Sequence, residues 1–462
     1  MKEPPINFQR ILQDAAEHYR RGQTEEAAAC YRSALALRPE CAEVMNNLGV
    51  TLEAQGSLEE AVSAYGRALT LKPEYAEARF NLGNVSWKRG NLQAAVDSYR
   101  QVLAGNPAHV EAHCNLGSIL HDMGNIDAAM LCYERALEIQ PDSAYAAWNR
   151  SLLQLLHGDF TSGWRNFEAR RRTKSSPRQL PQPLWCGQPL DGARILLHAE
   201  QGLGDTIQFL RYLPMVQAAG GSVALCLPAR LRRIAQLLPQ VEALVATGEP
   251  LPPVDWQLPL MSLPLAFGTT LESIPAGVPY LSIPEEAAQA ASRLVWPADE
   301  LRVGIAWAGS PSHAKDRFRS MPFTALAPLL RLKGVHFFSL QMGLASRQLN
   351  GALGEVTDLA PFTSDLADTA AQMAYLDLVI TVDTSIAHLA GALAVPVWTL
   401  LGYAADWRWL LNRDDSPWYP TMRLFRQPSL GNWRAVMEAV LAALLERVAD
   451  PVRNQCCMAE AR

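Results

Sequence analysis

Residues 41–74 read CAEVMNNLGVTLEAQGSLEEAVSAYGRALTLKPE, and residues 75–108 read YAEARFNLGNVSWKRGNLQAAVDSYRQVLAGNPA. The two stretches match at a spacing of 34 residues, and the same spacing relates further units at 7–40, 109–142 and 143–176. The period predicts an α-solenoid of about five helical hairpins over residues 7–176, because one hairpin cannot bury its apolar face alone. The recurring positions are Gly22, Gly56, Gly90, Gly124 and Gly158 between the two helices, Tyr31, Tyr65, Tyr99, Tyr133 and Phe167 in the second helix, and Pro39, Pro73, Pro107 and Pro141 at its end.

These units resemble the tetratricopeptide repeat (TPR). The middle three share Asn-Leu-Gly at 47–49, 81–83 and 115–117, and such small residues let paired helices approach closely. The fifth unit departs from the pattern, since Trp148, Trp164 and Phe167 replace small or tyrosine positions. We expect this unit to cap the solenoid and to pack against the region that follows.

One asparagine recurs in the first helix of successive units. An amide side chain carries both a donor and an acceptor, so a ladder of amides along a concave surface can bind the backbone of an extended peptide. The superhelix of the protein O-linked N-acetylglucosamine transferases, which this arrangement resembles, uses asparagines in this way. The alternative is that asparagine is simply common at this repeat position. The candidate peptide-binding residues are Asn47, Asn81, Asn115 and Asn149.

Composition limits the function classes. Hydrophobic residues make up 49% and charged residues 19%, as in folded globular proteins. A formal charge of −5 and a pI near 6.0 argue against a nucleic-acid partner, which would normally meet a basic face. No stretch approaches the roughly 18 apolar residues of a membrane span, and the first ten residues lack a signal pattern. The eight cysteines form no CxxC pair, so we expect free thiols and a cytoplasmic location.

Residues 177–192 are rich in proline and polar residues and are predicted to form a linker. Beyond them, short apolar runs alternate with helical stretches, which indicates βαβ units and parallel sheets. We expect two Rossmann-like α/β domains, at 193–295 and 296–450, that face each other with ligands at the carboxyl ends of the strands. The predicted strands are 194–199, 222–227, 242–246, 256–260, 302–307, 335–340, 378–382 and 397–401.

The loop after the first predicted strand contains Gly202, Gly204 and Asp205. The glycines permit a tight turn and let a ligand approach the backbone. The third glycine of a dinucleotide fingerprint is missing, because Ile207 stands at its position. Asp205 therefore has two interpretations, a catalytic group at the sheet edge or an ordinary helix cap.

A basic loop follows the strand predicted at 302–307. It combines a glycine–serine turn with four basic or titratable side chains, and small residues with cations suit a diphosphate. A solvated run of charges is the alternative. The candidate donor-binding residues here are Ser310, Lys315, Arg317 and Arg319, with His313 among them.

The strand predicted at 378–382 runs into Asp383-Thr384-Ser385 and then a helix. The amides and positive end of a helix N-terminus favour an anion. Asp383 could cap this helix or bind a sugar hydroxyl. His388 lies about one turn further along on the same face. Two aromatic loops, 406–409 and 417–420, could either line the cleft between the domains or seal its floor.

Together the three loops resemble those of the two-domain GT-B glycosyltransferases, and most nearly the lipopolysaccharide heptosyltransferase family. That family has a Gly-Asp loop, matched by Gly204-Asp205, and a basic residue before a helix that begins with proline, matched by Arg319 and Pro322. Its Asp-Thr-Gly-x-x-His-Leu motif is matched by residues 383–389, with Ser385 in place of the glycine. The resemblance covers roughly residues 193–445. We therefore expect an α-solenoid followed by an α/β GT-B fold.

The resemblance implies an inverting transferase in which Asp205 is the base and the other two loops hold a nucleotide-diphosphate sugar. It implies no cofactor beyond that co-substrate, and the loops contain no DxD motif that would indicate a metal. The acceptor would be a protein or peptide on the solenoid. The alternative is a non-catalytic TPR scaffold with a degenerate sugar-nucleotide domain. We cannot choose among Lys315, Arg317 and Arg319 for the phosphate contact from sequence.

Overall fold

The computed structural model describes residues 6–173, 180–313, 315–349 and 356–449. The first residues of the expected linker, 177–179, and residue 450 of the second expected α/β domain lie outside these ranges. Contacts divide the chain into two compact units, Met1–Arg150 and Ser151–Arg462. Six cysteines fall within the described residues, and all of them are free thiols.

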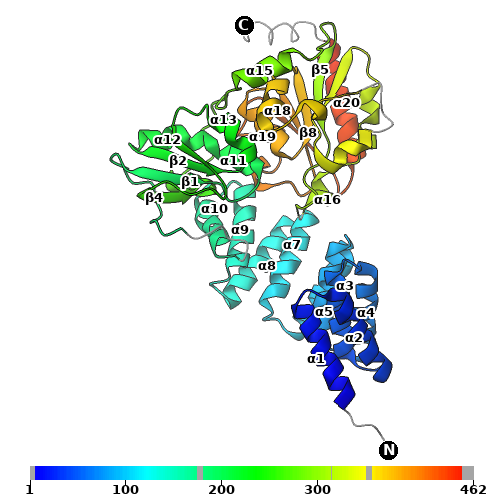
Figure 1. Cartoon of the computed structure of the whole chain (residues 1–462). Helices are drawn as coiled ribbons and strands as arrows, with labels where there is room; N and C mark the ends of the chain where they lie inside the picture. Colours follow the sequence, from blue (N-terminus) through cyan, green and yellow to red (C-terminus); the bar gives the residue numbers. More distant parts are fainter. Residues whose placement is uncertain (1–5, 174–179, 314, 350–355, 450–462) are drawn as a thin grey trace, which may run out of the picture. The chain divides into compact units, whose positions relative to one another are not determined.

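The repeats form consecutive antiparallel helical hairpins (Figure 1). Each turn glycine adopts a left-handed backbone conformation, with φ between 75° and 84°. Residues with a Cβ atom rarely adopt this conformation, whereas glycine does so readily. This conformation explains why glycine recurs at the end of every first helix. The helices are α1 (Ile6–Arg20), α2 (Thr24–Leu37), α3 (Ala42–Ala54), α4 (Leu58–Leu71), α5 (Ala76–Lys88), α6 (Leu92–Gly105), α7 (Val110–Asp122), α8 (Ile126–Ile139), α9 (Ala144–Leu156) and α10 (Phe160–Phe167).

Within a hairpin, the repeat tyrosine packs directly on the repeat glycine. A Cβ added at Gly83 would lie 2.8 Å from Cε1 of Tyr99, and one added at Gly49 would lie 2.5 Å from Cε1 of Tyr65. Both tyrosine side chains are fully buried. The glycine thus allows the two helices to close on an aromatic ring, which is why the two positions recur together.

The second helix of the fifth repeat, α10, belongs to the same compact unit as the α/β region. The ring centroids of Trp164 and Trp407 lie 5.1 Å apart in an edge-to-face pair, and Phe167 contacts Trp407 in the same way. The indole of Trp164 also donates to the backbone oxygen of Thr269, at 3.1 Å. The expectation that the fifth unit packs against the following region is confirmed.

The first α/β subdomain contains a four-stranded parallel sheet in the order β3-β2-β1-β4 within the described residues. Consecutive strands extend outward from β1 to β3, and β4 then adds on the other side of β1. The switch point therefore lies between β1 and β4. Its elements are β1 (Arg194–His198), α11 (Leu203–Phe209), α12 (Leu213–Ala218), β2 (Ser222–Leu227), α13 (Arg232–Ala235), β3 (Val241–Ala246), β4 (Trp256–Pro259) and α14 (Leu263–Ala266). The next helix, α15 (Glu285–Ser292), packs against α18 (Leu366–Met373) of the second subdomain.

The second α/β subdomain contains a six-stranded parallel sheet in the order β10-β9-β8-β5-β6-β7, again counted over the described residues. This is the doubly wound order, and its switch point lies between β5 and β8, where ligands bind in such sheets. The basic loop and the Asp383 loop follow these two strands. The elements are β5 (Leu301–Ala306), α16 (Asp316–Arg319), α17 (Ala327–Leu330), β6 (Val335–Ser339), β7 (Val356–Asp358), α18 (Leu366–Met373), β8 (Leu378–Val382), α19 (Ser385–Ala392), β9 (Val397–Leu401), β10 (Met422–Arg426) and α20 (Trp433–Ala449).

An α-solenoid followed by an α/β region of two parallel sheets is the fold class that the sequence predicts. All eight predicted strands are present, and their bounds differ from the observed ones by at most one residue. Two strands were not predicted. The edge strand β7 has only three residues, too few for a recognisable pattern. In β10 arginines interrupt the apolar residues, so that no continuous apolar run marks the strand.

Replacing Gly83 by alanine should destabilise the solenoid by about 1–3 kcal/mol, because the new methyl group overlaps the buried ring of Tyr99. Gly66 provides the matched control, since it lies inside α4 with nothing within 4 Å of an added Cβ. There the same substitution should stabilise by about 0.5–1 kcal/mol through the better helix propensity of alanine. Urea midpoints followed by far-ultraviolet circular dichroism measure both effects. Equal shifts in one direction would refute this account of the glycine–tyrosine contact.

Candidate active site

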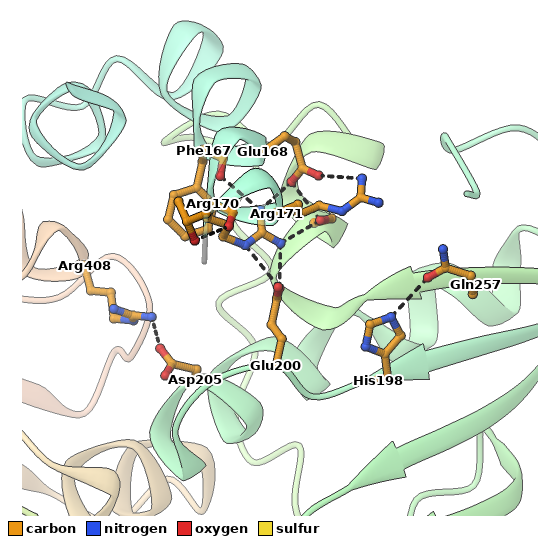
Figure 2. A network of polar contacts seen from close by, with 11 residues as sticks. Phe167, Glu168, Arg170, Arg171, His198, Glu200, Asp205, Gln257 and Arg408 are labelled. Atoms are coloured by element: carbon orange, nitrogen blue, oxygen red, sulfur yellow. Dashed lines mark hydrogen bonds and ion pairs between the residues drawn. The ribbon is translucent and has the colours of Figure 1, made fainter. Parts of the chain in front are cut away.

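The carboxyl ends of both sheets contribute side chains that contact one another. Asp205, on α11 after β1, forms an ion pair with Arg408, in the loop after β9 (Figure 2). The other carboxylate oxygen of Asp205 accepts a hydrogen bond from the backbone N–H of Gly202, at 2.8 Å. Asp205 therefore lies in the third position of α11 and reaches back to the helix start. It is not the N-cap, which is Gly202.

Arg408 connects the two halves of the site. Its side chain is 8% exposed and contacts Asp205, Asp406 at 2.7 Å, and the amide oxygen of Gln208. Burial alone would lower the pKa of this guanidinium, but the carboxylates of Asp406 and Asp205 outweigh burial and raise it. The guanidinium also lies over the ring of Trp407, 4.4 Å from its centroid. Arg408 is thus a permanent cation shared by two acids.

His388 occupies a buried position beside the glycine loop. A Cβ added at Gly204 would lie 2.7 Å from Cδ2 of the imidazole, so glycine is required for this close approach. The Nδ1 atom is 2.9 Å from the hydroxyl of Tyr419, and the ring stacks on Trp409 with centroids 5.5 Å apart. Burial, and then the guanidinium groups of Arg408 and Arg211, lower the pKa of His388 well below its usual value. The imidazole is therefore neutral at neutral pH.

Arg319 joins the basic loop to the loop after β8. Its Nη1 donates to the backbone oxygen of Asp383, at 3.2 Å, and its Nε lies 3.3 Å from a carboxylate oxygen of Asp316. The carboxylate of Asp383 in turn accepts from the indole of Trp409, at 2.9 Å. Burial and the neighbouring Asp406 raise the pKa of Asp383 to about 6.

Asp383 does not cap α19, so that one of its two expected roles is wrong. Thr384 is the N-cap, and its hydroxyl accepts from the backbone N–H of Ile386, at 3.3 Å. The physical reason is position, because Thr384 and not Asp383 directly precedes the first helical residue, Ser385. The Asp383 carboxylate accepts from the indole of Trp409. Ser385, which stands in the place of the family glycine, begins the helix.

The rest of the basic loop is more exposed. The hydroxyl of Ser310 pairs with Ser312 at 2.8 Å, and the guanidinium of Arg317 lies over the ring of Phe318, 4.6 Å from its centroid. The backbone N–H of Lys315 donates to His313 at 3.2 Å. Burial and the charge of Arg319 lower the pKa of His313. Of the three cations that sequence could not separate, Arg319 contacts the Asp383 loop.

The candidate asparagine ladder lies on the first helices of the repeats. Asn47 is exposed, while Asn81 donates to the side chain of Asn46 at 3.0 Å and Asn115 donates to Asn84 at 3.0 Å. The amide of Asn149 donates to the backbone oxygen of Tyr145. The middle amides thus tie neighbouring repeats together through their nitrogens. Peptide binding by these residues stays a prediction.

Sequence reasoning missed Arg408 and left the role of its loop open. The two aromatic loops contact both α10 and the site residues, while their lining or sealing of a cleft stays a prediction. Trp407 packs on α10, while Arg408, Trp409 and Tyr419 contact Asp205, Asp383 and His388. The usable signal was position, because residues 406–409 follow a predicted strand at the same sheet edge as Asp383.

Comparison with known families agrees with this geometry. Residues 13–76, 59–110 and 110–143 match the tetratricopeptide repeat, and residues 275–428 match glycosyltransferase family 9 (heptosyltransferase). The chain carries TPR repeats and a family 9 glycosyltransferase region. The matched region contains the basic loop, the Asp383 loop and the Arg408 loop.

The chain is also similar to Protein FlbA of Caulobacter vibrioides, with 29% identity over 338 residues. The match covers 67% of this chain and 56% of that protein, so the chain spans only about half the length of its curated relative. Among solved structures, MamA has a TM-score of 0.33 at 22% identity, covering 38% of this chain and 98% of MamA. A TPR protein from Parabacteroides merdae has a TM-score of 0.34 at 20% identity, covering 37% and 68%.

Within the described ranges, no helix combines the length and the apolar character that crossing a bilayer requires.

Replacing Asp383 by asparagine should change the pH dependence of stability. The folded protein keeps the Asp383 proton up to about pH 6, whereas an unfolded aspartate loses it near pH 4, so ionisation in this window removes stability. Asparagine cannot ionise and can still accept from Trp409. The variant should therefore match wild type near pH 4 and melt on the order of 2–3 °C higher above pH 6. A difference in melting temperature that is constant with pH would contradict the raised pKa.

Proposed function

We propose that this protein is an inverting, metal-independent glycosyltransferase that moves a sugar from a nucleotide-diphosphate donor to a hydroxyl of a protein or peptide held by the TPR repeats. One observation carries the proposal: Asp205, which follows the first sheet, forms an ion pair with Arg408 of the second sheet's loops. The neighbouring Gly204 packs on His388, and Arg319 contacts the Asp383 loop. Sugar transfer between a donor and an acceptor needs a base for the acceptor hydroxyl and cations for the donor diphosphate. The two sheets supply both kinds of group.

The donor side is assigned to the second sheet. Arg319, beside the N-terminus of α19, would offset the charge of a diphosphate, and the helix end supplies amides and a positive dipole. Thr384 and Ser385 would lie against the same group. Asp383, whose pKa is raised to about 6, would accept or donate a hydrogen bond to a sugar hydroxyl. Neutral His388 could hold the donor without adding charge.

The acceptor side is assigned to Asp205. The acceptor oxygen attacks the anomeric carbon, the bond from that carbon to the diphosphate oxygen breaks, and the acceptor proton passes to Asp205. Attack opposite the leaving group inverts the anomeric centre. Arg408 keeps a second carboxylate, Asp406, when Asp205 is neutralised, so its charge stays compensated throughout. Stabilising the leaving diphosphate, the larger task, falls to Arg319 and α19.

The protein acceptor is assigned to the repeats. TPR arrays present long surfaces for extended partners, and the exposed Asn47 and half-buried Asn81, Asn115 and Asn149 offer amides at regular spacing. The acceptor oxygen atoms of these amides could bind the backbone of such a partner. Several of their nitrogens are already bonded within the repeats, so the ladder would act mainly as a row of acceptors.

A second function is favoured by a specific observation. Both carboxylate oxygens of Asp205 already accept hydrogen bonds, one from Arg408 and one from Gly202. Such a carboxylate suits a structural role in a non-catalytic scaffold that binds sugar nucleotides. Turnover separates the two functions, because a scaffold would bind the donor without transferring the sugar.

A panel of nucleotide-diphosphate sugars, screened by thermal shift and then by transfer to peptides, tests the proposal. Asp205→Asn should bind the donor within about threefold of wild type but lower kcat by about 10²–10⁴-fold, the usual contribution of a general base. Asp406→Asn is the matched control, because it also removes one acid from Arg408 but lies outside the reacting geometry. It should cost less than tenfold in kcat. The reaction is run with and without EDTA.

Each result has a defined meaning. Turnover by wild type that persists in EDTA and is lost in Asp205→Asn supports the proposal. Donor binding without turnover in wild type identifies the scaffold function. Equal losses in the Asp205 and Asp406 variants would make the ion pair with Arg408, not base catalysis, the reason for the effect.

Two of the three cations of the basic loop, Arg319 and Arg317, should differ in their contribution to kcat/KM. Arg319→Gln removes a guanidinium that contacts the Asp383 loop. It should lower kcat/KM by about 10²–10³-fold, the usual cost of losing one group that stabilises negative charge on a leaving group. Arg317→Gln, which removes a more exposed guanidinium, should cost less than about fivefold. Steady-state kinetics with varied donor measure both. A larger loss for Arg317 would reassign the phosphate contact.

A further inference from the structure

A buried polar network ties the end of the repeat array to the loop that carries Asp205. The 3₁₀ segment Glu168–Arg172 directly follows α10. Its Arg170 donates from Nε and Nη2 to one carboxylate oxygen of Glu200, at 3.2 and 2.5 Å (Figure 2). Glu200 lies in the loop between β1 and α11, five residues before Asp205.

The Arg170–Glu200 pair is almost completely shielded from solvent. The side chains of Arg170 and Glu200 are 2% and 1% exposed. Arg170 also donates to Glu168, at 2.6 Å, and to the hydroxyl of Ser262, at 2.7 Å, and that hydroxyl donates to Glu168 at 2.7 Å. One guanidinium thus serves two carboxylates and a hydroxyl from three separate segments. Such a fork geometry is specific to arginine.

Burying a charged pair is costly unless its geometry is good and its remaining groups are hydrogen-bonded. A well-packed apolar pair would often be at least as stable. The stability of the fold therefore does not by itself account for an ion pair at this place. What the pair does provide is a fixed position for Glu200, since two N–H groups of one guanidinium converge on the same carboxylate oxygen and restrain both its distance and its direction.

The partner of Asp205 is supported from the same helix. Trp164 and Phe167 of α10 pack on Trp407, the residue next to Arg408. The end of the repeat array therefore contacts the Asp205 loop through Arg170 and the Arg408 loop through its aromatic rings. Both members of the Asp205–Arg408 pair are held from one side.

We propose that Arg170 is a positioning residue for the transferase site: through Glu200 it fixes the loop that places Asp205 against Arg408, so the last repeat forms part of the site's supporting structure. This inference rests on the proposed function for its catalytic consequence. Its structural consequence, order in the loop 199–206, can be measured without any activity.

The test compares Arg170→Met with Arg302→Gln in the full chain. Arg302 forms a bidentate pair with Asp377, at 3.0 and 2.7 Å. This pair lies at the amino end of β5, whereas the site lies at the carboxyl ends of the strands. Arg302→Gln is therefore a control for the loss of an ion pair away from the site. Hydrogen exchange in residues 199–206 should be at least tenfold faster in Arg170→Met and unchanged in Arg302→Gln. In Arg170→Met, kcat for sugar transfer should fall at least tenfold while the KM for the donor stays within threefold of wild type. Arg302→Gln should show no such fall in kcat.

Conservative variants separate positioning from general destabilisation. Glu200→Gln keeps an oxygen that can accept from Arg170, so its kcat should stay within about threefold of wild type. Arg170→Lys keeps the charge but cannot reach all three partners, so it should show the fast exchange of Arg170→Met. This variant also replaces Arg170→Met if the latter does not fold.

Unchanged exchange in residues 199–206 of the Arg170 variants would overturn the inference. So would an equal loss of kcat in Arg302→Gln at the same melting temperature. If wild type shows no transfer to any acceptor, the proposed function fails, and the exchange comparison still decides whether Arg170 orders the loop.

Discussion

The Asp205–Arg408 ion pair is the contact on which the arrangement of the site depends. It joins a helix that follows the first sheet to a loop that follows the second, across 203 residues of sequence. Burying the Arg408 guanidinium without paired carboxylates would cost several kcal/mol of desolvation free energy. Asp205 and Asp406 together offset that cost. His388 and Trp409 then pack around the pair, and Asp383 is held through the indole of Trp409.

The charges around this pair are balanced rather than uniformly positive. Arg319, Arg408 and Arg211 surround His388, while Asp205, Asp383 and Asp406 stand among them. Arg211 is buried against the rings of Tyr280 and Tyr419 and donates to backbone oxygens. The result is a site with fixed cations whose neighbouring imidazole is neutral. Such a site can bind an anionic leaving group without needing a change in histidine protonation.

Most of the fold could be read from the sequence because its signals are local. The 34-residue period, the turn glycines and the apolar runs of β1, β2, β5, β8 and β9 each report on their own segment. The loops carrying Asp205, Arg319 and Asp383 were also found, since position after a strand predicts the sheet edge. Arg408 was missed because its role comes from a partner distant in sequence. Asp383 was partly misread because α19 begins one residue later than a cap at Asp383 requires, and sequence signals locate helix ends only to within a few residues.

The aromatic contact between α10 and the loop of Trp407 has a practical consequence for dissecting the chain. Trp164 is 2% exposed and Trp418 is fully buried, and their ring centroids lie 6.4 Å apart. A fragment starting at the proline-rich segment near 180 would lack α10 and Trp164, and would leave the indoles of Trp407 and Trp418 facing water, which favours aggregation. Expression fragments and chimaeras with other repeat arrays should instead begin before Ala144, so that both helices of the last repeat, α9 and α10, stay intact.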